Sequence, residues 1–348
     1  MIVGAMVASV VVLLVVANLV GCSLSAPVWR GPTTDHFDGE RFRNEGETEH
    51  AGFGSMVKWM VSRDPGPWKA VTDAPFGPLP PARVGAGELR VTFVNHATVL
   101  VQVDGLNLLT DPVWSDRVSP FSWVGPERQR PPGLRFEDVP KIDAVLLSHN
   151  HYDHLDEATI RRLVERDKPK IYSGLGMSAW FEAKGMPATV DLDWWQGADL
   201  TPQVRVTAVP ARHFSGRGTQ DRDKVLWVGF VVQSPAGAVY FAGDTGMGPH
   251  FQQIGQKFAP LRLALLPIGA FRPTWFMSRV HVSPAEAVEA QLLTGARTAV
   301  AIHFGTFKLA DDGQDEPVVE LHKALDAKGK DAPRFWVLGF GEGRDVPQ

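Results

Sequence analysis

The chain has 348 residues, of which 44% are hydrophobic and 21% charged, and its formal net charge is −4. This apolar content, with 11 tryptophans and 19 phenylalanines, excludes intrinsic disorder as the main state. The weak negative charge, without any block of lysines or arginines, excludes a nucleic-acid binder. A single cysteine excludes an internal disulfide framework, and the eleven histidines direct attention to metal binding.

The first segment is an apolar, uncharged run over residues 2–20, followed by Gly21 and Cys22. It resembles a bacterial lipobox, which predicts a signal peptide over residues 1–21 and lipid modification at Cys22. An uncleaved signal anchor is the alternative because the run approaches the length of a membrane span. A buried core helix is a third interpretation. Both membrane interpretations predict a tethered protein of the bacterial cell envelope, on the periplasmic side.

Residues 22–87 are predicted to form a tether and lead-in segment before the main domain at 88–348. The first part is polar and charged, and prolines crowd the stretch 65–81. Trp59, Trp68 and Phe76 indicate that part of this segment docks on a surface, since free aromatics in a linker would expose apolar area.

From residue 88 onward, strands and helices alternate. Strands are expected at 89–94, 98–103, 106–110, 143–148, 204–209, 225–233, 238–241, 263–267 and 298–302. A helix is expected from about Asp156, and the capping box Ser283-Pro284-Ala285-Glu286 predicts another that runs to about Leu293. Interleaved strands and helices of this kind predict an α/β or α+β sandwich.

The densest chemistry lies directly after the expected strand 143–148. His149, His151, Asp153 and His154 place four potential metal ligands within six residues. Imidazoles and carboxylates are ligands that zinc and its neighbours accept. A polar turn with solvated histidines is the alternative, but the density of donors favours a metal site.

Three further donors close apolar runs elsewhere in the chain. His213, Asp244 and His303 each follow an expected strand. A charge or imidazole at the end of a buried strand is unfavourable unless it is coordinated or paired. Together with the histidine-rich segment, these residues predict a site that can hold two metal ions.

Several longer stretches identify a family resemblance. They are Asn-His-Ala-Thr-Val-Leu-Val at 95–101, Thr-Asp-Pro-Val-Trp-Ser at 110–115, Leu-Asp-Trp-Trp at 192–195, Phe-Ala-Gly-Asp-Thr-Gly at 241–246, the segments 267–277 and 281–287, and Ala-Ile-His-Phe-Gly-Thr-Phe at 301–307. With the histidine-rich segment, the chain resembles the metallo-β-lactamase superfamily, and more narrowly the phospholipase D branch that hydrolyses N-acylphosphatidylethanolamine. The resemblance implies an α/β fold, a four-layer αββα sandwich with two mixed β-sheets.

The resemblance also implies roles for individual residues. His149, His151 and His213 would bind one zinc ion, Asp153, His154 and His303 would bind the second, and Asp244 would bridge the two. Asp111 would orient a ligand, and Tyr152 and His281 would contact the substrate. His281 stands directly before a predicted helix N-terminus, where an anion such as phosphate is favoured. Iron or manganese could occupy the same ligands.

The implied reaction is hydrolysis of a phosphodiester by a hydroxide held between the metal ions, with phosphatidic acid and an N-acylethanolamine as products. Asp153, Asp244 and His281 are the residues expected to act in catalysis, with water or His281 protonating the leaving alcohol. The expected partners are a phospholipid or another small molecule and a membrane, not nucleic acid, and oligomer formation is left open.

Other functions remain as alternatives. A lactonase or small phosphodiester hydrolase, similar to ascorbate-phosphate lactonases, would use the same metals. A narrow polar pocket would favour it. A β-lactamase is less favoured because no cysteine ligand is present. A metal-dependent envelope lipoprotein without catalytic activity is the non-enzymatic alternative.

Overall fold

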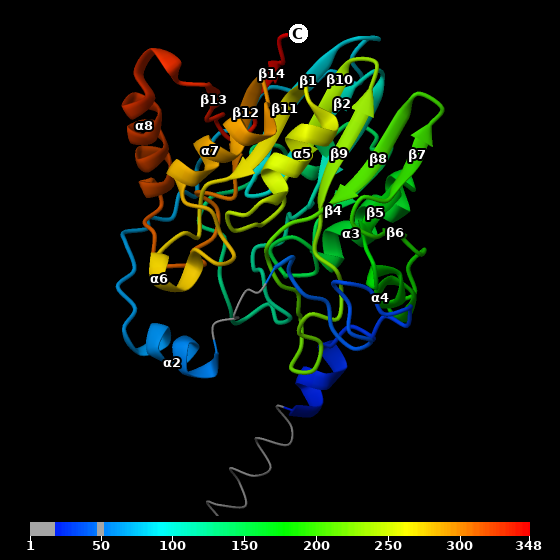
Figure 1. The fold of residues 1–348 in the computed structure, drawn as a ribbon, viewed down its shortest axis with the longest axis vertical. Helices are drawn as coiled ribbons and strands as arrows, with labels where there is room; N and C mark the ends of the chain where they lie inside the picture. Colours follow the sequence, from blue (N-terminus) through cyan, green and yellow to red (C-terminus); the bar gives the residue numbers. More distant parts are fainter. Residues whose placement is uncertain (1–17, 47–51) are drawn as a thin grey trace, which may run out of the picture.

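The computed structural model describes residues 18–46 and 52–348. Two seven-stranded sheets form the centre of the molecule (Figure 1). The first sheet has the order β14 (Gly343–Asp345), β1 (Leu89–Asn95), β2 (Thr98–Val103), β3 (Leu106–Thr110), β4 (Ala144–Leu147), β5 (Lys170–Gly174) and β6 (Val190–Leu192). The second has the order β13 (Arg334–Trp336), β12 (Thr298–Ile302), β11 (Leu261–Pro267), β10 (Gly237–Phe241), β9 (Gly229–Ser234), β8 (Val204–Val209) and β7 (Gly197–Thr201).

Both sheets are mixed, and their strand directions follow one scheme. In the first sheet, β14 to β3 pair antiparallel and β3 to β6 pair parallel. In the second sheet, β7 to β10 pair antiparallel and β10 to β13 pair parallel. The carboxyl ends of parallel strands meet at one edge of a sheet, so the loops after these strands can share one site.

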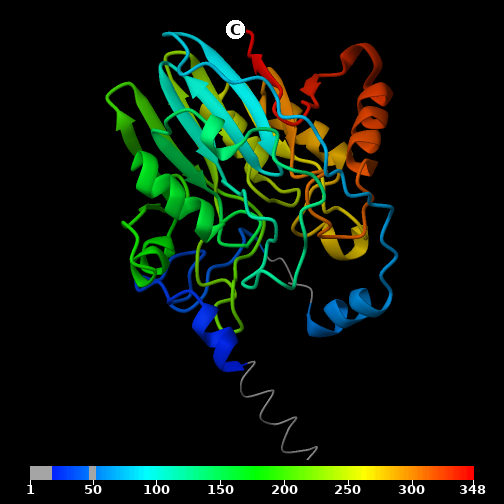
Figure 2. The ribbon, with the colours of Figure 1, turned by 180° about the vertical axis from the view of Figure 1, so that it is seen from behind.

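Helices cover the outer face of each sheet. Against the first sheet, α3 (Glu157–Asp167) buries Ile160 and Leu163 among strand residues such as Val145, and α4 (Met177–Ala183) joins the same core. The second sheet carries α5 (His250–Phe258), α7 (Pro284–Thr294) and α8 (Glu316–Lys328). Figures 1 and 2 place these two helix groups on opposite sides of the molecule. The four-layer αββα sandwich with two mixed sheets expected from the sequence is therefore confirmed.

Local signals place the helix starts correctly. The side chain of Asp156 accepts hydrogen bonds from the backbone N–H groups of Ala158 and Thr159 at the start of α3. At the start of α7, Ser283 and Glu286 form the expected capping box.

One expected strand is shorter than its apolar pattern suggests. The run 225–233 was expected to be a single strand, but β9 begins at Gly229. Val225 to Val228 are buried, yet their backbone bonds go elsewhere: the N–H of Leu226 donates to Leu175 O at 2.9 Å and that of Val228 to Ser148 O at 3.0 Å. This segment therefore crosses between the sheets instead of pairing within one.

The described part of the lead-in segment packs on the domain. Phe37 and Phe42 are each 1% exposed and belong to the main core. The indole N–H of Trp59 donates to Asp311 Oδ2 at 3.0 Å, and that of Trp68 donates to Asp312 O at 2.8 Å. Both side chains thus dock as expected, whereas Phe76 stays 43% exposed.

Most of the predicted signal segment, residues 1–17, lies outside the described residues. Residues 18–24 are helical and Cys22 is exposed. Within residues 18–46 and 52–348, no helix has both the length and the apolar character needed to cross a membrane. The helical segment 18–24, α2 (Phe53–Val61) and α6 (Thr274–Met277) lie at the end of the molecule opposite the C-terminus (Figures 1 and 2).

Candidate metal centre

The donors predicted from the sequence meet where strands of both sheets end. The segment after β4 supplies four of them, and the others follow β8, β10 and β12. Ligand atoms in several overlapping groups lie within 4.8 Å of one another. The fold therefore brings all seven predicted metal ligands into one buried region.

The first donor set consists of three histidines. Nε2 of His149 lies 2.8 Å from Nδ1 of His151, and Nε2 of His213 lies 3.3 Å from the same atom. His149 and His213 are 1% exposed. Three converging imidazole nitrogens of this kind suit zinc.

The second donor set surrounds Asp153. Its Oδ2 lies 3.4 Å from Nε2 of His154 and 3.5 Å from Nε2 of His303. His96, which the sequence reasoning did not single out, also belongs here, since its Nε2 lies 3.1 Å from Asp153 Oδ2.

Asp244 lies between the two sets. Its Oδ2 is 3.1 Å from Nε2 of His154, 3.1 Å from Nε2 of His303 and 3.7 Å from Nε2 of His213. One carboxylate therefore faces donors of both sets, which is the position that a bridging ligand requires. The backbone makes this approach possible at Gly243, where φ is +60° and a Cβ would lie 2.6 Å from that of Ser148.

The remote nitrogens of three histidines are held by other groups. Nδ1 of His154 lies 2.6 Å from Asp111 Oδ2, and Nδ1 of His213 lies 3.0 Å from the carbonyl oxygen of Val280. Nδ1 of His149 contacts Ser148 Oγ at 2.9 Å. Each bond turns Nε2 toward the centre, as expected of ligating histidines. Asp111 thus lies where the resemblance placed it.

Unpartnered buried atoms test whether metal ions fit this site. Three buried atoms have no hydrogen-bond partner in the described chain: Nε2 of His154, Nε2 of His303 and Oδ1 of Asp244. Buried polar atoms in that condition are unfavourable. A metal ion would satisfy them, because imidazole nitrogen and carboxylate oxygen are its usual ligands. The donor set therefore fits metal ions.

The ionisation of the donors differs between residues. Burial opposes protonation of His154 and His303, but Asp244 and neighbouring carboxylates raise the pKa of His154 well above its usual value and that of His303 to about 9, so a metal ion must displace a proton from each. Burial, followed by neighbouring imidazoles, holds the pKa of His149 well below its usual range. Burial opposes ionisation of Asp244, but His154 and His303 hold its pKa well below the usual range. Neutral imidazole and ionised carboxylate are the forms that coordinate a metal.

Backbone strain concentrates at the same place. His96, Asp111 and His303 have φ values of +45°, +29° and +62°, in the left-handed region that L-residues rarely adopt. Such conformations cluster at functional sites because the surrounding structure must hold them.

The two predicted substrate contacts border the centre differently. The ring of His281 lies 5.1 Å from that of His213 and 5.4 Å from that of His303. Burial lowers the pKa of His281 to about 4. The Tyr152 hydroxyl instead donates to Arg217 O at 3.1 Å, and the Arg217 guanidinium lies over the Tyr152 ring, 3.9 Å from its centroid.

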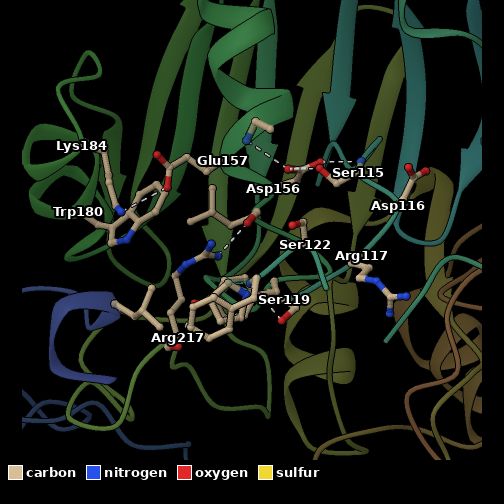
Figure 3. A pocket seen from close by; sticks show the side chains of 16 residues that line it. Ser115, Asp116, Arg117, Ser119, Ser122, Asp156, Glu157, Trp180, Lys184 and Arg217 are labelled. Atoms are coloured by element: carbon tan, nitrogen blue, oxygen red, sulfur yellow. Dashed lines mark hydrogen bonds and ion pairs between the residues drawn. The ribbon is translucent and has the colours of Figure 1, made fainter. Parts of the chain in front are cut away.

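Tyr152 also lines a cavity of about 460 Å³, whose wall contains none of the seven predicted metal ligands. Figure 3 shows Arg217 in its wall, with Trp180, Lys184 and Glu157 on one side and Arg117 on the other. Charged and apolar side chains are mixed around it. This mixed lining differs from the narrow polar pocket that would favour a lactonase.

Besides His96, the sequence reasoning missed Asn44. Its Oδ1 accepts from the backbone N–H of His213 at 3.0 Å, and its Nδ2 donates to His213 O at 2.9 Å. The Trp227 indole N–H also donates to Asn44 Oδ1, at 2.9 Å. The lead-in segment thereby fixes the backbone of a predicted ligand, and no local sequence pattern reports such a contact.

Comparison with known proteins defines the class of this chain. A family model described as "Beta-lactamase superfamily domain" matches residues 106–304. The chain belongs to the metallo-β-lactamase superfamily, which confirms the resemblance seen in the sequence.

Two relatives extend this result. An uncharacterized protein of Mycobacterium tuberculosis is 42% identical over 262 residues, which cover 72% of this chain and 69% of the relative. The N-acyl-phosphatidylethanolamine-hydrolyzing phospholipase D 1 of Caenorhabditis elegans is 38% identical over 251 residues, which cover 69% of this chain and 70% of the relative.

Solved structures share the fold. Igni18, a metallo hydrolase from Ignicoccus hospitalis, superposes with a TM-score of 0.56 at 25% identity and covers 75% of this chain and 99% of its own. The metallo-β-lactamase fold protein YhfI from Bacillus subtilis gives a TM-score of 0.52 at 16% identity, over 74% of this chain and 99% of its own.

Proposed function

We infer that this protein is a metal-dependent hydrolase, and we propose that it is a phospholipase D acting on N-acylphosphatidylethanolamine-type lipids. The observation that carries the proposal is the position of Asp244 Oδ2, 3.1 Å from His303 Nε2 and 3.7 Å from His213 Nε2, between two donor sets. Sites with two adjoining metals serve in-line displacement at phosphorus. The similarity to the Caenorhabditis elegans phospholipase supports the lipid substrate.

Hydrolysis here would break the bond between phosphorus and the ethanolamide oxygen. The oxygen of water joins phosphorus, and the departing oxygen takes a proton from water, because His281 with its lowered pKa of about 4 is uncharged near neutral pH. When bound, the metal ions supply charge stabilisation at the phosphoryl oxygens and lower the pKa of water. Asp153 and Asp244 hold ionised carboxylates where the metal ions would bind, and His281 lies beside both donor sets.

The cavity beside Tyr152 fits an amphiphilic substrate. Arg217 and Lys184 can face the anionic part of a lipid head group, while Trp180 and Phe121 offer apolar surface. The volume of about 460 Å³ is within the range of small-molecule sites. We propose that the head group enters from this side.

The test is product analysis with the full-length protein in detergent. The zinc-loaded protein is incubated with N-acylphosphatidylethanolamine in ¹⁸O-labelled water, and mass spectrometry follows the products. Phosphatidic acid carrying the label, together with unlabelled N-acylethanolamine, is the expected result. Iron-loaded and manganese-loaded samples, with metal analysis of the protein as isolated, identify the native metal.

Two variants make this test specific. Asp244→Asn should abolish product formation, whereas Asp199→Asn, at an exposed position on β7, should leave it unchanged. Two bound metals without lipid turnover would contradict the proposed substrate and direct the search to lactones and small phosphodiesters. Metal binding without turnover of any of these would leave the non-catalytic lipoprotein.

We further propose that the protein is tethered to a membrane of the bacterial envelope through Cys22. The Cys22 thiol is exposed, and the end of the molecule that carries it also carries exposed apolar side chains on α2 and α6, namely Met60, Val61 and Trp275. A surface of this kind suits contact with lipid.

Mass spectrometry of the mature N-terminus tests this tether. A diacylated Cys22 is expected, lost in Cys22→Ala and kept in Ser23→Ala. An intact first segment with an unmodified thiol would indicate the signal anchor instead.

A further inference from the structure

His303 is a predicted metal ligand whose remote nitrogen lacks a hydrogen-bond partner in the described chain. His149, His154 and His213 each have a partner for Nδ1. Nδ1 of His303 is buried and has no hydrogen-bond partner among the described residues. Nε2 of His303 is directed at the predicted metal centre, and a metal ion bound to it would leave the imidazole proton on Nδ1, which then needs an acceptor.

Two other unpartnered atoms lie beside it. Nδ1 of His96 and Oδ1 of Asp312 are also buried without a hydrogen-bond partner in the described chain. His96, His303 and Asp312 all line one small cavity, whose other walls include Trp68 and Phe307. Three unsatisfied polar atoms around one space indicate a shared polar occupant.

The size of the space and the number of groups both indicate a single water molecule. The cavity measures about 10 Å³, close to the ~10 to 15 Å³ that one water requires. A buried water usually makes about three hydrogen bonds. The space is too small for an ion with its own ligands or for an organic group.

We propose that this cavity holds one ordered water that links His303 and His96 to Asp312. The water accepts from Nδ1–H of His303 and donates to Oδ1 of Asp312 and to Nδ1 of His96. Donors and acceptors balance, because Nε2–H of His96 donates to Asp153 Oδ2 at 3.1 Å and leaves its Nδ1 free to accept. Asp312 is then a positioning residue for the second donor set, acting through the water.

The arrangement of Asp312 supports this role. Its Oδ2 accepts from the backbone N–H of Ala270 at 3.2 Å, which leaves Oδ1 for the cavity. Its neighbour Asp311 is equally buried, at 5% exposure, but binds the lead-in segment through Trp59 and Arg63. The two adjacent carboxylates therefore bind different groups: Asp312 borders the cavity and Asp311 holds the lead-in segment.

The lead-in segment also closes the cavity. Trp68 lines it and donates its indole N–H to Asp312 O at 2.8 Å. A segment outside the two sheets therefore completes the support of a predicted metal ligand. The inference rests on the metal centre of the proposed function, and the experiment separates the two.

The test compares Asp312→Asn with its matched control, Asp311→Asn. In Asp312→Asn, the amide oxygen can keep the bond from Ala270 and the amide N–H₂ then faces the cavity, where an acceptor is needed. We expect a ~10- to 100-fold weaker affinity for one of two zinc ions, measured by chelator competition with metal analysis. Asp311→Asn should lower thermal stability and leave both zinc affinities within about twofold of the parent.

A crystal structure of the zinc-loaded parent protein gives an independent measurement. One ordered water within hydrogen-bond distance of His303 Nδ1, His96 Nδ1 and Asp312 Oδ1 is expected. An empty cavity, or unchanged zinc affinity in a folded Asp312→Asn variant, overturns the inference and leaves the metal centre intact. A parent protein that binds no metal would instead contradict the metal centre itself.

Discussion

The two halves of the donor set are built in different ways. One segment after β4 supplies His149, His151, Asp153 and His154, so a single turn fixes their relative positions. His213, Asp244 and His303 come from the ends of three strands of the second sheet, and their positions depend on how the sheets pack. The first half therefore depends on local geometry, and the second half depends on the whole fold.

The largest expected effect is at Asp244, the residue of the second half that lies between the two donor sets. Asp244→Asn removes the shared negative charge facing His154, His213 and His303. We expect loss of both zinc ions and a fall in hydrolysis of about 10³-fold or more. Metal analysis after dialysis and product assays check this result.

The control for Asp244→Asn is His149→Ala, which removes a ligand from the first set only. It should lower the affinity for one zinc ion far more than the affinity for the other. Equal loss of both ions in His149→Ala, or full metal content in Asp244→Asn, would show that Asp244 does not link the two donor sets.

A smaller effect is expected where the first sheet supports the segment after β4. Asp111 accepts from Nδ1 of His154 and from the backbone N–H and hydroxyl of Ser148. Asp111→Asn should weaken metal affinity about 10- to 100-fold, as measured by chelator competition. Unchanged affinity would mean that the segment after β4 holds its histidines without help.

The next prediction tests how far the second half, through His213, depends on the lead-in segment. Asn44→Ala removes the hydrogen bonds to His213 and leaves its backbone N–H unsatisfied. Chemical denaturation should show a loss of about 1 to 3 kcal/mol in the free energy of unfolding. The neighbouring Glu45→Ala, at an exposed position, should change it by about 0.5 kcal/mol or less.

The smallest expected effect is a pH dependence of lead-in docking. Burial disfavours the charged form of His36, but hydrogen bonds to Asp193 at 2.7 Å and Asp35 at 2.6 Å raise its pKa above the usual value. The stability from protonated His36 is fully present below its unfolded pKa of 6.5 and is lost as pH rises through the higher folded value.

Denaturation of the parent and of His36→Gln at pH 6 and pH 9 measures this contribution. The difference between the two proteins should be larger at pH 6, by about 1 kcal/mol or less. A difference that grows toward pH 9 would contradict the assigned ion pairs.

The same division explains which parts of the molecule could be predicted from the sequence. The dense donors around His151 and the capping box at Ser283 are local patterns, and both are visible in the chain. His96 stands alone in its segment, and only the pairing of β1 with β2 turns it toward Asp153. The run after Val225 shows the reverse case, in which a strand-like apolar pattern belongs to a buried crossing segment.

Asn44 and Asp312 were invisible for a further reason. Asn44 acts on a residue 169 positions away, and Trp68 contacts Asp312 across 244 positions. Polar side chains of this kind are not part of a periodic hydrophobic pattern from which their contacts could be predicted. Their roles follow from packing between distant segments, which a single sequence does not encode locally.

The pairing of β1 with β14 has a consequence for the order of synthesis. The first strand of the domain, from Leu89, is synthesised long before its edge partner at Gly343–Asp345. Asp311 and Asp312, which receive Trp59 and Trp68, also emerge late. The nascent chain therefore exposes an open sheet edge and unburied indoles until these later segments have been synthesised, and this interval is when binding by a chaperone would protect it from aggregation.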